Sequence, residues 1–193
     1  MNLFVLDADP RLAAQAHHDV HCNKMATEAG QIGTAALAVA LASYDEVPAA
    51  RPGHTKKRWK RPLDPGWGVS HPYHPATRWA AASRGNFLWA LQLGLSLCDE
   101  WHYRFDTPHG ARPTLERLFA YAQGHDGIFA QSGRTPFIVA FDAVRYADCL
   151  QNDIVASYRA YYARYKLNLP TKGPPRWTRR APPQWLDRYR SET

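Results

Sequence analysis

The chain of 193 residues has 45% hydrophobic and 12% aromatic residues and a formal net charge of +7. These values predict a globular protein with one domain, large enough to bury a core. No run of about 18 apolar residues occurs, so we expect no membrane span. The start Met-Asn-Leu-Phe-Val-Leu-Asp lacks the basic residues and the apolar length of a signal peptide, so we expect none.

The positive charge is concentrated in two proline-rich segments. Residues 51–61 carry a net charge of +6 and residues 172–190 a net charge of +5, which leaves −4 for the rest of the chain. This pattern is typical of basic arms that bind an anionic partner. The three cysteines are far apart and odd in number, which indicates reduced, buried thiols in a cytoplasmic protein.

Four or five helices with little strand are expected. Residues 2–7 form a short apolar segment that is either a strand or a buried, extended lead-in. Asp9 and Pro10 are typical of a helix start, since the carboxylate caps and proline needs no N–H bond at the first position. Helices are predicted over residues 9–41, 76–105, 114–123 and 153–167.

The segments between and after these helices are rich in proline. Residues 47–75 are interpreted as a basic loop inserted into a helical domain of residues 1–169. Residues 170–193 are expected to form an extended tail packed on that domain, with Trp177 and Trp185 as anchors. The predicted fold is therefore all-α: one compact helical domain with two long buried helices, the basic loop and the tail.

A polar stripe runs along the first predicted helix, whose other positions are mostly small and apolar. The stripe is roughly 80° wide at 100° per residue. On a helix wrapped by other protein, such residues need partners or line a cavity. The candidate catalytic residues on and beside it are His17, Asp19, His21, Lys24 and Glu28.

Three interpretations of the stripe compete. His17 and His21 could share a metal ion with Glu28, but the cation of Lys24 on the same stripe would oppose it. We therefore expect neither a metal nor a cofactor, and favour acid–base groups with an anion contact. A purely structural network of buried polar residues remains the alternative.

Two further groups suit substrate binding, although capping and packing would account for them equally well. The prolines of His71-Pro-Tyr-His74-Pro lead into a helix N-terminus, where anions are favoured, and Arg78 in the first turn suits a phosphate. The candidate substrate-binding residues are Gln31, His71, His74, Arg78, Ser83, Asn86, Arg134 and Thr135.

The basic segments interleave cations with aromatic rings. Such a stretch can bind phosphates by charge and stack a base on Trp59, whereas a solvated loop is the alternative. The candidate nucleic-acid-binding residues are Lys56, Lys57, Arg58, Trp59, Lys60, Arg61, Arg176, Arg179 and Arg180.

Several motifs resemble a family of uncharacterised proteins of tailed bacteriophages over nearly the whole chain. They are the start Met-Asn-Leu-Phe-Val-Leu-Asp, Asp9-Pro10 with Ala13, Ala14, His17, Asp19, His21, Lys24 and Met25, His71-Pro-x-His74-Pro with Trp79, Ser83, Asn86 and Trp89, Thr135-Pro-Phe, and Tyr158-Arg159-x-Tyr161-Tyr162. The resemblance implies a protein of the host cell cytoplasm, and it implies no activity.

A weaker similarity links the chain to phage-type pyrimidine-dimer DNA glycosylases of the endonuclease V kind. These are small all-α proteins with an apolar N-terminal lead-in and a C-terminal segment rich in Trp, Tyr and Lys. The similarity implies base flipping and attack on a sugar C1′ by the N-terminal amine, with a glutamate assisting. Glu28 is the nearest acidic counterpart, and Lys24 could supply the amine instead.

Three functional hypotheses follow. The first is a DNA-acting enzyme, a glycosylase or a base-modifying enzyme, that uses the polar pocket of the first helix without metal. The second is a non-catalytic phage factor that binds a nucleotide or a host defence protein. The third is a nucleic-acid-binding module. Phosphate-binding glycine loops, hydrolase serine motifs and dinucleotide fingerprints do not occur, which disfavours those classes of enzyme.

Overall fold

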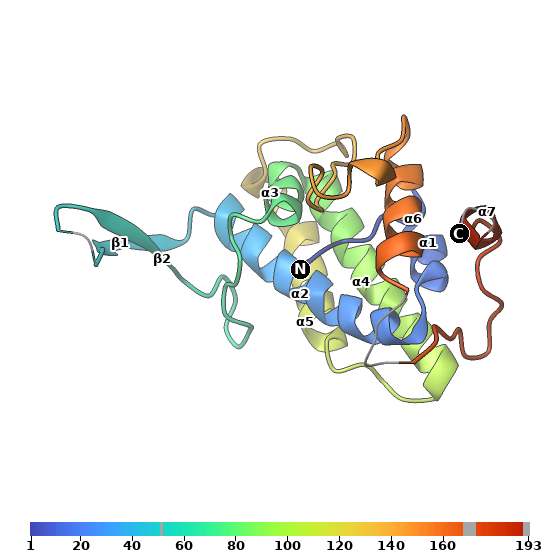
Figure 1. The fold of residues 1–193 in the computed structure, drawn as a ribbon. Helices are drawn as coiled ribbons and strands as arrows, with labels where there is room; N and C mark the ends of the chain where they lie inside the picture. The colour runs from blue at the N-terminus through green and yellow to red at the C-terminus, as the bar shows by residue number, and fades with distance from the viewer. Residues whose placement is uncertain (51, 168–172, 191–193) are drawn as a thin grey trace.

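Two long helices, α2 (Asp19–Ala40) and α4 (Arg84–Phe105), pack against each other at the centre of the fold (Figure 1). The computed structural model describes residues 1–50, 52–167 and 173–190. A Cβ atom on Gly33 would lie 2.6 Å from Leu91 Cδ2, and one on Gly94 would lie 2.8 Å from Ala29 Cβ. Glycine at these positions therefore lets the two helix backbones approach closely.

Three shorter helices cover this pair. They are α1 (Pro10–Ala16), α3 (Pro75–Ala82) and α5 (Arg112–Gly124), and α5 buries Leu115 and Leu118 against α2 and α4. The prediction of a helix from residue 114 was right in kind, although α5 begins two residues earlier. Pro113 in the first turn needs no N–H bond there, which is why the helix starts before it.

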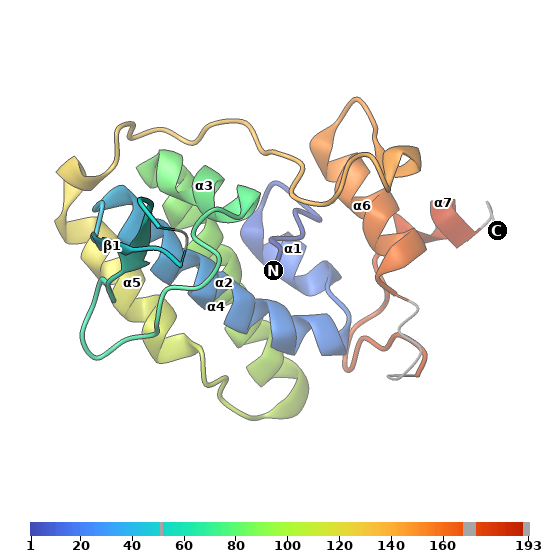
Figure 2. The same cartoon turned by 60° about the vertical axis from the view of Figure 1, so that its left-hand side comes forward.

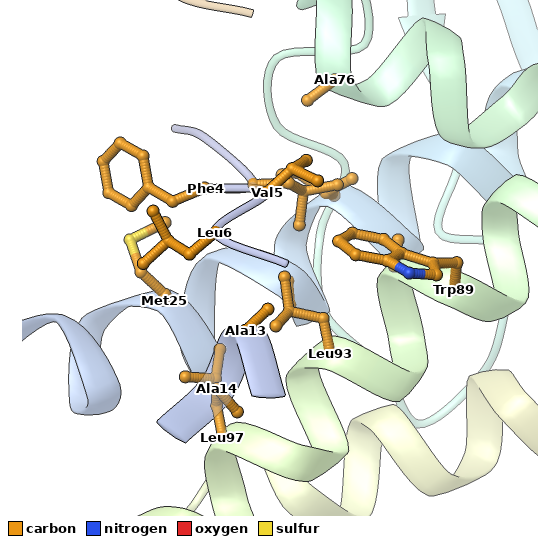
Figure 3. Packing of buried hydrophobic residues seen from close by; sticks show 14 of the residues in the cluster. Phe4, Val5, Leu6, Ala13, Ala14, Met25, Ala76, Trp89, Leu93 and Leu97 are labelled. Carbon is orange, nitrogen blue, oxygen red and sulfur yellow. The ribbon is translucent and has the colours of Figure 1, made fainter. Parts of the chain in front are cut away.

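The N-terminal segment is a buried, extended lead-in rather than a strand. Residues 3–6 are at most 4% exposed. Figure 3 shows Phe4 and Leu6 among side chains that include Met25, Ala14 and Leu97. All four residues are buried, instead of alternating as on a one-sided strand, because α1, α2 and α6 surround the segment on several sides.

Both long predicted helices are interrupted, so these predictions were wrong in continuity. The first breaks at His17, which has an extended backbone (φ −68°, ψ 135°). The second breaks at Ser83 (φ −151°, ψ 156°), whose hydroxyl accepts from the Asn86 backbone N–H at 3.1 Å. Ser83 is therefore the N-cap of α4, a position that serine favours.

A two-stranded antiparallel hairpin projects from the end of α2 (Figures 1 and 2). It pairs β1 (Tyr44–Pro48) with β2 (Thr55–Trp59) and places Tyr44 opposite Trp59. The fold is thus mostly helical with a small sheet, and not strictly all-α as predicted. The expected loop over residues 47–75 was wrong in its first part, because cross-strand aromatic packing stabilises a ribbon that prolines and cations had masked.

The C-terminal part closes the structure. Asp153 caps α6 (Ile154–Tyr165), which lies within the helix predicted over residues 153–167. The tail is extended from residue 173 and ends in a short helix, α7 (Leu186–Arg190). Trp177 is 7% exposed and donates to the Ala16 carbonyl at 3.0 Å, which confirms it as an anchor. The predicted tail also includes residues 170–172 and 191–193, which lie outside the described residues.

Cys22, Cys98 and Cys149 are all buried and unpaired. Within the described ranges, no helix is long and apolar enough to cross a membrane.

Arg104 occupies a buried junction of α4 with the α1–α2 corner. Its Nε atom donates to Glu100 at 2.7 Å and its Nη1 atom to Asp19 at 2.9 Å. The guanidinium also donates to the carbonyls of His17 at 2.9 Å and Gln15 at 3.1 Å. Because the side chain of Arg104 is 0% exposed, these bonds replace all of its hydration.

Replacing Arg104 by Met should lower the free energy of unfolding by about 3–5 kcal/mol, because the carboxylate of Glu100 stays buried with one charge partner fewer. Urea denaturation at neutral pH measures the loss. Arg112→Met is the matched control, since Arg112 pairs with Asp99, which is 71% exposed, and should cost no more than about 1 kcal/mol. Equal losses in the two variants would contradict the role given to the junction.

Candidate active site

The predicted polar stripe falls into two parts with different surroundings, although His21, Lys24 and Glu28 all lie on α2. The first part is a histidine cluster, made of His17, His18 and His21 around Tyr162 of α6. The second part, one to two turns further along α2, contains Lys24 and Glu28. The chemistry open to each part depends on its burial.

The histidine cluster is sealed inside the protein. Its three histidines are at most 4% exposed. The Tyr162 hydroxyl accepts from the His18 backbone N–H at 3.1 Å and lies 3.0 Å from His21 Nδ1. The Nδ1–H of His17 donates to the Ala13 carbonyl at 2.7 Å. The rings pack closely, with 4.3 Å between the centroids of His18 and His21.

Burial keeps these three rings neutral. The pKa of His17 is lowered to about 3, that of His18 to about 4 and that of His21 to about 2, with burial as the largest cause at each ring. His18 contributes to the lowered pKa of His17 and His21. Among the described residues, no group of three or more His, Cys, Asp or Glu side chains is placed to hold a metal ion. His17 and His21 therefore form part of the core and do not reach a substrate.

Asp19 belongs to the joint between the body and the tail. Its carboxylate accepts from Arg104, from the Thr178 backbone N–H at 3.0 Å and from the Thr178 hydroxyl at 2.7 Å. The Asp19 backbone N–H donates to the Arg176 carbonyl at 2.8 Å. We assign this predicted catalytic residue a structural role, because its oxygens are occupied by the protein.

The second part of the stripe brings amines to a carboxylate, and we call Met1, Lys24 and Glu28 the amine–carboxylate site. Glu28 Oε2 accepts from the Asn2 backbone N–H at 2.7 Å and lies 3.8 Å from the ammonium of Met1. Glu28 Oε1 lies 3.2 Å from Lys24 Nζ. The carboxylate is only 11% exposed, whereas the Lys24 side chain is 62% exposed.

His74 lies at the edge of this site. Burial lowers its pKa, and the charges of the amino terminus and of His71 lower it further, whereas Glu28 raises it. Its Nδ1 atom accepts from the Ala76 backbone N–H at 3.2 Å, as the N-cap of α3. The neutral ring of His74 therefore carries its proton on Nε2, and this Nε2–H group is the hydrogen-bond donor of the side chain.

The other predicted substrate-binding residues are dispersed. Asn86 donates to the Trp79 carbonyl and to Thr135 Oγ1, each at 2.8 Å, and accepts from the Thr135 backbone N–H at 2.8 Å. Asn86, Ser83 and Thr135 thus fasten the loop after α5 to the α3–α4 corner. Arg134 lies over the Phe137 ring at 4.4 Å.

Gln31 is partly buried one turn beyond Glu28 on α2, and the Arg78 side chain is exposed on α3. Of these two residues, Gln31 lies nearer in sequence to the amine–carboxylate site.

The tail arginines are bound to the body. Arg179 pairs with Asp106 at 2.6 Å, and Arg180 donates to Glu100. Arg176 is exposed. A cleft of about 620 Å³ is lined by Arg159, Arg179 and Arg180, and Arg159 pairs with Asp7 at 3.0 Å. Since carboxylates already hold these cations, the cleft offers a ligand less charge than its composition indicates.

Sequence reasoning missed two parts of this arrangement. It could not show that four chain segments meet at Glu100 and Arg104. It also did not place the backbone of Asn2 on Glu28. The sequence contains the motif at the chain start and the glutamate on the helix, but the two are far apart in sequence. Nothing in the sequence therefore indicated that Asn2 and Glu28 are in contact.

Comparisons with protein families, with curated proteins and with solved structures find no match to this chain.

Acid should destabilise the protein through the histidine cluster. Below the ordinary histidine pKa of about 6.5, these histidines bind protons in the unfolded chain but not in the folded chain. The free energy of unfolding therefore decreases as the pH falls from about 6.5 toward the lowered pKa values of the folded protein. Each histidine contributes a slope of up to about 1.4 kcal/mol per pH unit. Thermal unfolding measured from pH 7 to pH 5 gives this slope.

His18→Phe should flatten the dependence on pH, because neither ring nitrogen of His18 has a hydrogen-bond partner to lose. His102→Gln, at an exposed position on α4, should leave the slope unchanged. An unchanged slope in the His18 variant would contradict the neutral, buried state of that ring.

Proposed function

We propose that the protein is a DNA-acting enzyme of the glycosylase or lyase type, and that the amine–carboxylate site is its reaction centre. The observation that carries the proposal is the position of Glu28, with Lys24 Nζ at 3.2 Å and the Met1 ammonium at 3.8 Å. A primary amine beside a largely buried carboxylate suits imine chemistry on a sugar carbon. The similarity to pyrimidine-dimer DNA glycosylases supports the same assignment.

The reaction balances as a displacement followed by imine formation. The unprotonated amine attacks C1′ of the deoxyribose, and the N-glycosidic bond breaks with its electron pair leaving on the base, which takes up a proton. Ring opening then gives a protonated imine between C1′ and the amine. Glu28 would transfer the protons and stabilise the cation, and the Nε2–H of His74 is a second donor at the edge of the site.

Two amines compete for the role of nucleophile. The Lys24 side chain is exposed and can reach a substrate without rearrangement. The Met1 amine lies 3.8 Å from the other oxygen of the Glu28 carboxylate. Either amine uses the same carboxylate, and a trapped adduct identifies which one reacts.

Borohydride should trap a covalent protein–DNA adduct, because it reduces the imine to a stable secondary amine. The test uses duplexes that contain a pyrimidine dimer, an abasic site or a modified base, and peptide mapping locates the bond at Lys24 or Met1. Glu28→Gln should lower the adduct yield and the turnover by about 100-fold or more while DNA binding persists. Lys24→Ala abolishes the adduct if Lys24 is the nucleophile.

Arg11→Gln is the control for loss of a cation, since Arg11 is 76% exposed on α1 and takes no part in the site. Absence of an adduct with every one of these duplexes would sink the imine mechanism. Retention of a nucleotide on purification, with no change in DNA, would favour the phage factor instead. Full activity of the Glu28 variant would remove this site from the reaction.

A further inference from the structure

The hairpin has two chemically distinct faces, because successive side chains of a strand point to opposite sides. One face carries Tyr44, Glu46, Lys57 and Trp59, and its charges cancel. The other carries Asp45, Val47, Lys56, Arg58 and, just beyond β2, Lys60, which gives it a net charge of +2. We call this second side the cationic face.

The neutral face is occupied by contacts within the protein. The Trp59 ring lies 5.1 Å from Tyr44 and 6.2 Å from Tyr73, between centroids. Lys57 Nζ lies 3.9 Å from the centroid of Tyr44. Trp59 is therefore not an open stacking platform, and its contact with Tyr73 sets the hairpin beside the segment that contains His71 and His74.

The cationic face is turned away from these rings. Lys60 Nζ lies 2.6 Å and Arg58 Nη2 lies 3.3 Å from the Asp45 carboxylate, which confirms that the three side chains share one side. Hydrogen bonds from Lys60 and Arg58, together with their charge, lower the pKa of Asp45, so the carboxylate stays ionised and restrains both cations. Lys56 is exposed further along the same side.

We propose that the cationic face of the hairpin docks on the sugar–phosphate backbone of double-stranded DNA. This inference rests on the proposed function in taking DNA as the partner, and adds which surface binds it and in which form. Lys56, Arg58 and Lys60 repeat every second residue, about 6.7 Å apart along a strand. A two-stranded ribbon also fits the width of the major groove.

The distribution of aromatic rings favours a duplex over a single strand. Proteins that bind single strands combine cations with aromatic platforms in the same groove, so that bases stack while phosphates are neutralised. In this hairpin the rings lie on the opposite side from the cationic row and pack on one another. The cationic face can therefore neutralise phosphates but cannot stack unpaired bases.

Fluorescence anisotropy of a short labelled duplex, measured across a range of salt concentrations, tests the proposal with the full-length protein. The variant K56Q/R58Q/K60Q should weaken duplex binding about tenfold or more and reduce the salt slope by about 2–3. Lys57→Gln removes one cation from the neutral face of the same ribbon and should change affinity less than about twofold. Asp45→Asn should tighten binding, because it releases Arg58 and Lys60.

Several outcomes would overturn the inference. The triple variant and Lys57→Gln could weaken duplex binding equally, or the Asp45 variant could bind the duplex more weakly than the unmodified protein. The protein could also bind a single strand of the same sequence more tightly than the duplex, or bind poly-glutamate as tightly as the duplex. Circular dichroism confirms that each variant is folded. Borohydride trapping reports the proposed function separately: a missing adduct with an intact effect of the triple variant refutes the chemistry alone.

Discussion

Burial of one guanidinium organises the structure. Arg104 donates hydrogen bonds to the backbone carbonyls of Gln15 and His17, and His17 is the residue at which the chain breaks between α1 and α2. It also holds Glu100, which in turn receives Arg180 of the tail. A cation enclosed in this way is tolerated only if every donor is matched. The corner of the first two helices, the middle of the fold and the tail are consequently fixed by the same group.

Burial decides which residues of the polar stripe can react. The break takes His17 out of the helix, whereas His21, Lys24 and Glu28 stay on the continuous helix α2. His17, His18 and His21 lie around Tyr162, where burial leaves them neutral. Lys24 and Glu28 remain near the surface, where the extended N-terminal segment reaches the carboxylate. Solvation thus separates a structural cluster from a group of residues that can exchange protons and form bonds.

The two basic segments also differ in what their charges do. In the tail, Arg179 and Arg180 are held by Asp106 and Glu100, so their main effect is to fasten the chain end to the body. The hairpin projects away from the core. On its cationic face, the carboxylate of Asp45 pairs with Lys60 and so reduces the net positive charge of that face. A similar net charge in sequence therefore corresponds to internal pairing in one segment and to an external surface in the other.

The sequence alone determined the helical character, the start of α1 at Asp9 and Pro10 and the Trp177 anchor, because capping and apolar periodicity are local. It also located the polar residues from which the candidate site is drawn. Tertiary structure alone decided the breaks at His17 and Ser83, the hairpin, and the pairing of Glu28 with the chain start. Each of these depends on partners distant in sequence, whose hydrogen bonds and ring contacts outweigh local helix preference.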